Sequence, residues 1–115
     1  GHRKEASKDT AKGIKAILDE LKTRLPKTKI LLLAIFPRGK DDNNALRKLN
    51  QGTNKIICTY ADDKTVFFLD INDKFLDKDR NLPKSIMPDR LHPNKKGYEI
   101  WAEAIEPTVK KLIAE

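Results

Sequence analysis

Lys29-Ile30-Leu31-Leu32-Leu33-Ala34-Ile35-Phe36 is the stretch of this sequence that decides its fold. Its residues from Ile30 to Phe36 are all apolar, and Pro26 and Pro37 stand on either side of the run. A short continuous apolar run, without alternating polar residues, indicates a strand buried on both faces, as in a parallel sheet. The turn residues that follow, Pro37-Arg38-Gly39, predict that the strand ends there.

A second apolar run predicts a second strand of the same kind. Thr65-Val66-Phe67-Phe68-Leu69 is short and apolar, and it follows Asp62-Asp63-Lys64, which has the composition of a turn. We expect Asp70 to mark the end of this strand. The residues from Asn72 to Asp89 show no regular pattern, apart from a helical turn expected around Lys74 to Leu76.

Ahead of the first strand, Ser7 to Leu25 predicts an amphipathic helix, with Ser7 or Asp9 as its N-cap and Pro26 closing it. Gly13 lies inside the pattern and costs about 1 kcal/mol relative to alanine, which indicates close packing at that position. The apolar residues of this helix recur with helical spacing: Ile14, Ile17, Leu18, Leu21 and Leu25.

Two further helices are expected. Asp41 to Asn44 offers several N-caps for the helix between the strands, and the final helix runs from about Asn94 to Ile113. Pro107 should kink or restart that final helix, because proline removes a backbone donor and clashes one turn back. The apolar side of the middle helix comprises Leu46, Leu49, Thr53, Ile56, Ile57 and Tyr60, and that of the final helix comprises Tyr98, Trp101, Ala102, Ile105, Val109, Leu112 and Ile113.

The alternation of helices and strands predicts an α/β fold with a parallel sheet. Two strands do not cover a run as apolar as Ile30 to Phe36 on both faces and both edges, because parallel sheets normally contain more strands. We therefore interpret residues 1–115 as the C-terminal portion of a single doubly wound domain.

The bulk composition excludes several classes of protein. With 115 residues the chain is one domain or part of one, and its longest apolar run is too short to span a membrane. The net charge of +7 raises the question of nucleic acid, but the lysines are scattered among acidic residues, which favours a solvated basic surface. The single cysteine, Cys58, excludes an internal disulfide, and its place on the apolar side of a helix predicts a buried thiol.

The most informative candidate site is the pair Asp89 and His92. A carboxylate three residues ahead of a histidine can reach back to Nδ1 and fix the imidazole in one tautomer, as in the triad of serine hydrolases. Pro93 favours an extended backbone at His92 and suits the first turn of the helix that follows. The same spacing also fits a plain structural role, in which Asp89 caps a turn and His92 packs against the helix.

A nucleophile is hard to find in this sequence. Ser7 is interpreted as a helix cap, and Ser85 has neither a neighbouring glycine nor a strand leading into it, so no nucleophile elbow or oxyanion hole forms there. Cys58 is equally unsupported as a nucleophile. His2 stands near the terminus and is interpreted as a bystander, and one useful histidine with separated carboxylates gives no metal-ligand spacing.

Several segments resemble one known family. The stretch Pro88-Asp89-Arg90-Leu91-His92-Pro93-Asn94-Lys95-Lys96-Gly97-Tyr98 resembles the closing block of the SGNH, or GDSL-type, serine esterases. Three other segments resemble the platelet-activating-factor acetylhydrolase branch in order and spacing: Leu31 to Gly39, Leu46-Arg47 with Asn50 and Asn54, and Phe68 to Ile71. Arg80 stands where these relatives often have glycine. The resemblance covers essentially the whole chain.

The resemblance implies a flavodoxin-like three-layer α/β/α sandwich with a parallel sheet, and it implies roles for two residues. Asp89 would orient the base, and His92 would act as general base and acid. The family's Gly-Asp-Ser nucleophile turn and its oxyanion glycine and asparagine have no counterpart in this sequence, which starts, in this alignment, just past that asparagine. The resemblance requires no metal or cofactor.

Three hypotheses follow. The first is the C-terminal portion of an SGNH-type ester hydrolase acting on a short acyl ester, with Asp89 and His92 as its catalytic pair and the serine outside this chain. On that hypothesis the chain alone is inactive, and its partner is the serine-bearing half of the domain. The second is a non-catalytic α/β module that pairs its exposed strand with a partner or another copy of the chain. The third, a nucleic-acid binder, rests on charge alone.

Overall fold

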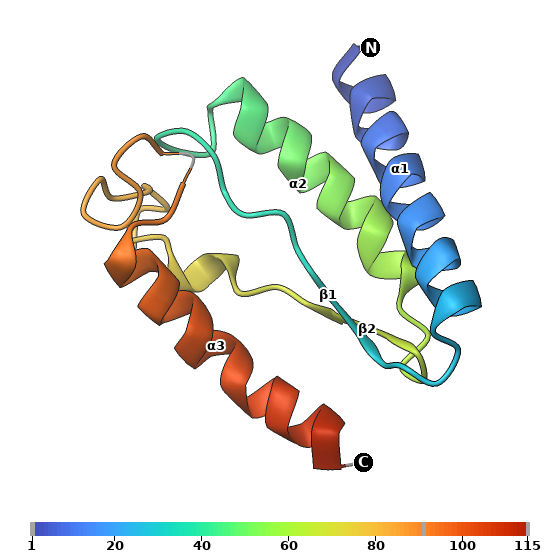
Figure 1. The fold of residues 1–115 in the computed structure, drawn as a ribbon. Helices are drawn as coiled ribbons and strands as arrows, with labels where there is room; N and C mark the ends of the chain where they lie inside the picture. Colours follow the sequence, from blue (N-terminus) through green and yellow to red (C-terminus); the bar gives the residue numbers. More distant parts are fainter. Residues whose placement is uncertain (1, 91, 115) are drawn as a thin grey trace. The chain divides into compact units, whose positions relative to one another are not determined.

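The computed structural model describes residues 2–90 and 92–114. Figure 1 shows an α/β chain in which helices alternate with two strands, as the sequence predicts. In chain order the elements are α1 (His2–Arg24), β1 (Ile30–Leu33), α2 (Ala45–Ile57), the 3-10 helix η1 (Cys58–Tyr60), β2 (Val66–Leu69), the 3-10 helix η2 (Asn72–Lys74) and α3 (Lys95–Ala114).

The two strands form a parallel pair, which confirms the sequence-based expectation. Ile30 lies opposite Val66 and Leu33 opposite Leu69. Two more hydrogen bonds extend the ladder beyond the strand ends: the Ile30 N–H donates to the Thr65 carbonyl at 2.7 Å, and the Ala34 N–H donates to the Leu69 carbonyl at 3.0 Å.

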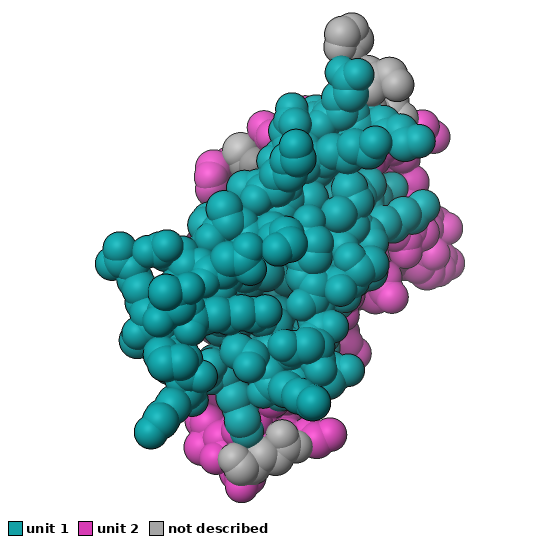
Figure 2. Space-filling view, turned by 90° about the vertical axis from the view of Figure 1, so that its right-hand side faces the viewer, with its two compact units in different colours: residues 1–35, 49–69 teal, residues 36–48, 70–115 magenta. Residues whose placement is uncertain are grey.

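The chain divides into two compact units, coloured separately in Figure 2. Unit 1 comprises residues 1–35 and 49–69, and unit 2 comprises residues 36–48 and 70–115. Unit 1 therefore contains α1, both strands and most of α2. Unit 2 contains the loop before α2, the long loop after β2, and α3.

The burial of β1 differs from the expectation. The four residues Ile30–Leu33 are all only partly buried, and among them and their chain neighbours up to Ile35 only Ala34 is fully buried. The reason is that the sheet has two strands within the residues that the structure describes. An apolar strand of a parallel sheet normally has neighbours on both edges and cover on both faces.

Asn54 on α2 fixes the point at which the chain leaves β1. Its side-chain amide makes both hydrogen bonds that a neighbouring strand would make. The Asn54 Oδ1 accepts from the Ile35 N–H at 2.7 Å, and the Asn54 Nδ2 donates to the Ile35 carbonyl at 3.0 Å. This pair satisfies the backbone of Ile35 with a side chain instead of a ladder.

The first helix begins earlier than predicted, and Ser7 is not its cap. Helix α1 starts at His2, so Ser7 lies inside it, 4% exposed, and its hydroxyl donates to the Leu49 carbonyl of α2 at 2.9 Å. A Cβ added to Gly52 would stand 2.8 Å from the Ser7 Oγ. Small residues on both helices thus allow α1 and α2 to approach closely at this point.

Several expectations about helix packing were wrong. An added Cβ at Gly13 meets nothing within 4 Å, so Gly13 does not mark close packing. Ile17 is 61% exposed, because the buried side of α1 is centred on Ser7, Ala11 and Leu18. Cys58 is exposed and not buried, because α2 ends at Ile57 and the backbone turns into η1.

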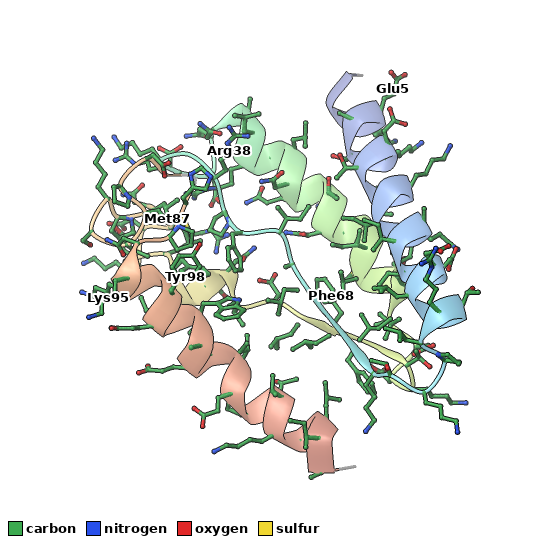
Figure 3. The ribbon with its side chains drawn as sticks, in the orientation of Figure 1. Glu5, Arg38, Phe68, Met87, Lys95 and Tyr98 are labelled. Carbon is green, nitrogen blue, oxygen red and sulfur yellow. The ribbon has the colours of Figure 1, made fainter. Side chains whose placement is uncertain are left out.

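The core of unit 2 lies in its loops as much as in its helix. Ile71, Phe75, Leu82 and Met87 are buried, and the rings of Phe36 and Phe75 pack at 4.9 Å between centroids. In Figure 3, Met87 lies in the loop beside the first turn of α3, which carries Lys95 and Tyr98. The long segment before α3 is irregular, as expected, and its helical turn is η2, slightly ahead of the predicted position.

Helix α3 continues through Pro107 without restarting. It runs from Lys95 to Ala114 as one helix with Pro107 inside it, so of the two expected effects of the proline, a kink or a restart, the restart does not occur. A proline removes one backbone hydrogen bond, and the bonds on either side hold the helix together. Tyr98, predicted on the apolar side, is exposed on this helix.

The turn before β2 is built around one carboxylate. Asp62 Oδ1 accepts hydrogen bonds from the N–H groups of Lys64, Thr65 and Val66, at 2.9, 2.8 and 2.9 Å. These backbone donors, Lys64 first, hold the pKa of Asp62 well below its usual range. Because three donors converge on the charged form, ionised Asp62 stabilises the start of the strand.

We predict that Asp62→Asn lowers the stability of the fold in a pH-dependent way. The depressed pKa means that the contribution of the charge is present above the unfolded pKa of about 4 and is lost as pH falls through the folded pKa. Urea denaturation at a series of pH values should show the largest difference between the two proteins near pH 7, and a shrinking one below about pH 4.

Asp63→Asn is the matched control for this measurement. Asp63 is the next residue, is exposed and has a positive φ of 58°, a conformation that asparagine tolerates. A loss of stability for Asp62→Asn that stays constant down to pH 3, or an equal pH dependence in the control, would contradict the role of the ionised carboxylate.

Candidate active site

The predicted contact between Asp89 and His92 is present in unit 2. Asp89 Oδ2 lies 2.7 Å from His92 Nδ1, and Asp89 Oδ1 accepts the His92 backbone N–H, also at 2.7 Å. Both oxygens of one carboxylate therefore hold the same residue, one on its ring and one on its backbone. This geometry selects the tautomer in which Nδ1 donates and Nε2 is free to accept a proton.

The pair is accessible. The side chain of His92 is 72% exposed and that of Asp89 is 54% exposed. Among the residues that the structure describes, no hydrogen bond to Nε2 of His92 is present. An oriented and largely exposed imidazole can accept a proton from a hydroxyl through Nε2 and return it to a leaving group.

Asn94 anchors the chain on the C-terminal side of His92. Its Oδ1 accepts from the Gly97 N–H at 3.0 Å, which makes Asn94 the N-cap of α3. Its backbone N–H donates to the Ile86 carbonyl at 2.8 Å, and its Nδ2 donates to the Ser85 carbonyl at 2.7 Å. A Cβ on Gly97 would stand 2.8 Å from the Ile86 carbonyl oxygen, so glycine allows this close approach.

Gly39 anchors the chain on the N-terminal side. Its N–H donates to the Arg90 carbonyl at 3.1 Å. Arg90, between Asp89 and His92 in sequence, has a positive φ of 54°, and Gly39 has a φ of 76°. A side chain at Gly39 would also collide with Asn44, because an added Cβ would stand 2.2 Å from the Asn44 Cγ. The turn that faces Arg90 therefore requires glycine.

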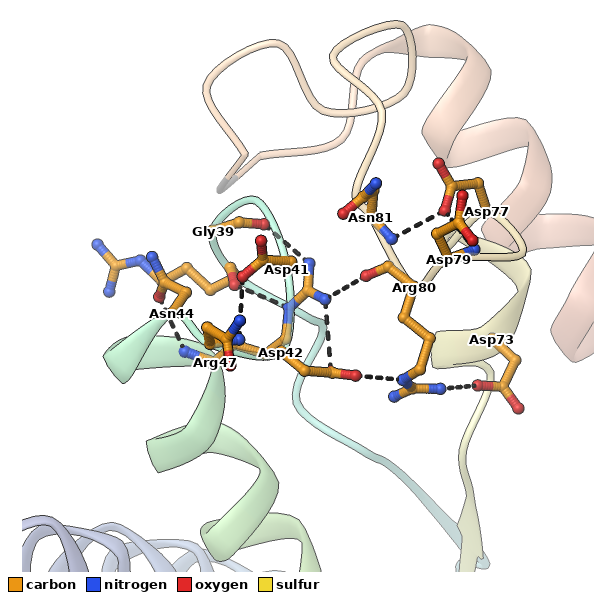
Figure 4. A network of polar contacts seen from close by, with 12 residues as sticks. Gly39, Asp41, Asp42, Asn44, Arg47, Asp73, Asp77, Asp79, Arg80 and Asn81 are labelled. Carbon is orange, nitrogen blue, oxygen red and sulfur yellow. Dashed lines mark hydrogen bonds and ion pairs between the residues drawn. The ribbon is translucent and has the colours of Figure 1, made fainter.

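Arg47 holds that turn from the first part of α2, as Figure 4 shows. Its side chain is 1% exposed. Nε donates to the Arg38 carbonyl at 3.1 Å and Nη2 to the Gly39 carbonyl at 2.9 Å. Nη1 donates to the Arg80 carbonyl at 2.5 Å. One guanidinium thus joins the loop before α2 to the long loop before α3.

An ion pair between Asp42 and Arg80 lies beside this guanidinium. Asp42 Oδ1 stands 3.5 Å from Arg47 Nη1, and Asp42 Oδ2 stands 2.6 Å from Arg80 Nε. Arg80 also reaches Asp73 at 3.3 Å. The hydrogen bond to Asp42 raises the pKa of Arg80 above its usual value. Arg80 has a positive φ of 64°, in the region that favours glycine, which is the residue expected here from the resemblance.

The other candidate residues make contacts of their own. The Ser7 hydroxyl is buried and bonded to α2 within unit 1, so it is not available as a nucleophile. Ser85 is on the same loop as His92, and its carbonyl is bound to Asn94. Cys58 is in unit 1, where its thiol contacts the Lys55 carbonyl at 3.2 Å. The side chain of His2, and the motif residue Leu91, lie outside the described residues.

Residues 2–90 and 92–114 contain no group of three His, Cys, Asp or Glu side chains that could hold a metal ion. Within the same ranges, none of the helices combines the length and apolar composition needed to span a bilayer.

Most of this sequence matches one protein family. Residues 1–100 match the family described as the GDSL-like Lipase/Acylhydrolase family. The match includes both anchors of the candidate site and the Asp89–His92 pair. It leaves out the last four turns or so of α3, which carry none of the contacts described above.

Curated relatives agree with the family. The platelet-activating factor acetylhydrolase IB subunit alpha1 of Homo sapiens is 30% identical over 104 residues, which is 90% of this chain and 45% of that protein. The alpha1 subunit of Pongo abelii is 31% identical over the same shares. The alpha2 subunit of Rattus norvegicus is 29% identical over 99% of this chain and 50% of its own length. The chain spans about half the length of these relatives.

A solved structure shares the fold. A protein of Streptococcus pneumonia, provisionally assigned as a platelet activating factor, superimposes with a TM-score of 0.75 and 21% sequence identity. The superposition covers 89% of this chain and 51% of the other.

The sequence predicts the pair but not the contacts that hold it. Asp89 and His92 are close in sequence, so their contact is predictable. Arg47 belongs to a segment that resembles the family, and nothing in its local pattern indicates burial. Its acceptors lie 8, 9 and 33 residues away along the chain.

We predict that Asn94→Ala destabilises the fold by about 1–2 kcal/mol, because it removes the cap of α3 and the bond to the Ser85 carbonyl. Thermal or chemical denaturation measures this loss. Lys96→Ala, in the same helix turn and exposed, is the control and should stay within about 0.5 kcal/mol of the parent protein. Equal losses in the two variants would contradict the anchoring role of Asn94.

Proposed function

The chain belongs to the GDSL-like lipase/acylhydrolase family, and from this premise we propose that it supplies the acid–base pair of an acyl ester hydrolase. The observation that carries the proposal is the 2.7 Å contact between Asp89 Oδ2 and His92 Nδ1, on an exposed loop. The relatives named as acetylhydrolases support a short acyl group, acetyl in particular, as the part of the substrate that is transferred.

In this proposal Asp89 has an orienting role. Its carboxylate keeps the proton on Nδ1 and stabilises the imidazolium that forms when Nε2 accepts a second proton. The bond from Oδ1 to the His92 N–H adds a second constraint on the same residue. The ring therefore presents Nε2 in one orientation before any substrate arrives.

His92 is the proposed general base and general acid. Nε2 takes the proton of a serine hydroxyl as the oxygen attacks the ester carbonyl, and it then returns that proton to the leaving alcohol. Water repeats the sequence on the acyl-enzyme, which releases the acid and restores the serine. None of these steps needs a metal or cofactor.

We place the serine and the oxyanion donors outside these 115 residues. Ser7 is buried and hydrogen-bonded, and Ser85 has no glycine elbow beside it. A base without a nucleophile or oxyanion donors does not form an acyl-enzyme. The chain alone is accordingly proposed to be inactive, and its partner is the serine-bearing part of the same domain.

A second candidate function rests on β1. Among the residues that the structure describes, this strand is apolar in sequence, partly buried in each residue, and paired with β2 along one edge only. An apolar strand with an open edge is a template for pairing. The alternative is therefore a non-catalytic module whose β1 pairs with a partner or a second copy of the chain.

We predict that His92→Ala reduces kcat of the full-length protein by about 10³-fold or more, because it removes the general base. Asp89→Asn should reduce kcat by about 10³- to 10⁴-fold, since it favours the wrong tautomer. Initial rates with a chromogenic acetyl ester, such as 4-nitrophenyl acetate, measure both effects.

Glu99→Gln is the matched control for Asp89→Asn. Glu99 is an exposed carboxylate on the first part of α3, in the same unit. Its kcat should stay within about twofold of the parent protein, because substitutions of exposed surface residues usually disturb a folded protein little. Near-normal turnover in His92→Ala would overturn the proposed function, whatever the control shows.

The strand-pairing alternative has its own test, the mass of the isolated 115-residue chain in solution. We predict that Leu32→Lys shifts the isolated chain toward the monomer, because a charge on β1 disfavours strand pairing. Light scattering coupled to size exclusion measures the change, with Lys29→Glu as a control outside the strand. A stable, monodisperse monomer in the parent chain would count against the alternative.

A further inference from the structure

A buried charge in unit 2 has no part in the chemistry proposed above. Arg47 is the largest of the fully buried side chains, at 1% exposure. Taking a guanidinium out of water is costly unless each donor finds an acceptor. An apolar side chain at this position of α2 would avoid that cost, so the arginine needs a reason beyond filling space.

The acceptors of Arg47 are mainly backbone carbonyls rather than carboxylates. Nε, Nη2 and Nη1 donate to the carbonyls of Arg38, Gly39 and Arg80 at 3.1, 2.9 and 2.5 Å. A planar fork of five N–H groups can fix several carbonyls at defined angles, which a lysine ammonium cannot do. The arrangement therefore sets the geometry of a loop (Figure 4).

One peptide group links this fork to the catalytic pair. The Arg38 carbonyl and the Gly39 N–H belong to the same planar peptide unit. Arg47 Nε holds its oxygen at 3.1 Å, and its N–H donates to the Arg90 carbonyl, also at 3.1 Å. A donor on the oxygen side of a peptide polarises its N–H and strengthens the bond on the other side.

Arg90 stands between the two members of the pair. Its carbonyl receives the Gly39 bond, and its φ of 54° is a sparsely populated conformation for a residue with a side chain. Such a conformation persists where surrounding contacts hold it. On the other side of His92, Asn94 is fixed independently by Ser85 and Ile86.

We propose that Arg47 is a positioning residue for the Asp89–His92 pair, acting through the Arg38–Gly39 peptide and the Arg90 carbonyl. The proposal rests on the proposed function, in which His92 is the base. Arg47 touches neither the substrate nor His92. It holds the turn that keeps Arg90, and with it the Asp89 carboxylate, in register with the imidazole.

A purely structural role makes a different prediction. If Arg47 only joins two loops, its substitution lowers stability and leaves the turnover of the folded protein unchanged. If it positions the pair, the folded variant loses kcat while KM changes little, because the substrate contacts remain. The two cases also differ in the hydrogen bond on His92 Nδ1.

The test compares Arg47→Lys with Lys48→Ala in the full-length protein that contains this chain. Arg47→Lys keeps the charge and loses the fork, whereas Lys48 is the exposed neighbouring residue on α2. We expect Arg47→Lys to lower kcat by about 10- to 100-fold with KM within about twofold, the effect of misplacing a catalytic group by about 1 Å. Lys48→Ala should leave both constants unchanged.

The second readout does not depend on activity. The ¹⁵N resonance of His92 Nδ1 reports whether that nitrogen carries the proton; it is read through the non-exchanging ring C–H protons in ¹⁵N-histidine-labelled protein and assigned by its loss in His92→Ala. In Arg47→Lys this resonance should move toward that of an unprotonated nitrogen, while the remaining amide spectrum stays that of a folded protein. In Lys48→Ala it should stay in place.

Each outcome decides the question. A folded Arg47→Lys protein with normal kcat overturns the proposal whatever its resonance, as does a lower kcat with an unchanged resonance. If Arg47→Lys does not fold, Arg47→Gln replaces it, because glutamine removes both the guanidinium fork and the buried charge. A shifted resonance with lower kcat then supports the proposal, and parent-like values overturn it. Activity in His92→Ala would instead refute the proposed function, and the resonance would still test Arg47.

Discussion

Unit 2 contains one buried guanidinium, and its need for hydrogen-bond acceptors determines how the loops of this unit are arranged. Arg47 is out of water, so its N–H groups must be paired, and the carbonyls of Arg38, Gly39 and Arg80 are what the chain offers. Those carbonyls come from two loops that are far apart in sequence. Satisfying one side chain therefore brings together the segment before α2 and the segment before α3, and the Asp89–His92 loop lies between this junction and the cap of α3.

Local patterns in the sequence predicted what depends on local physics. The run at Ile30–Leu33 predicted a strand, and its parallel pairing with Val66–Leu69 followed from the intervening helix. The Asp89–His92 contact was also predictable, because three residues are enough for the carboxylate to fold back on the ring. Asn44 was among the proposed caps of α2, and its Oδ1 accepts from the N–H groups of Leu46 and Arg47.

Tertiary contacts explain where the predictions were wrong. Ser7 has the composition of a cap, but its hydroxyl is used between helices, in a contact with Leu49 that no periodicity reveals. Cys58 continues the apolar pattern of α2, yet the helix ends one residue earlier and the thiol is exposed. The depth to which β1 is buried depends on what covers the sheet, which is a property of neighbours and not of the run itself.

The contact within the proposed pair is local in sequence, whereas the residues proposed to hold the pair in place are distant in sequence. Orientation of the imidazole needs a carboxylate three residues away, and the family match over residues 1–100 includes that motif. Keeping that carboxylate in register needs a peptide group at Gly39 and a cation at Arg47, some 40 to 50 residues before it. A short motif can thus mark the chemistry of a site, while a buried polar group elsewhere adds to its precision, because a packed side chain with paired donors holds a loop in one conformation.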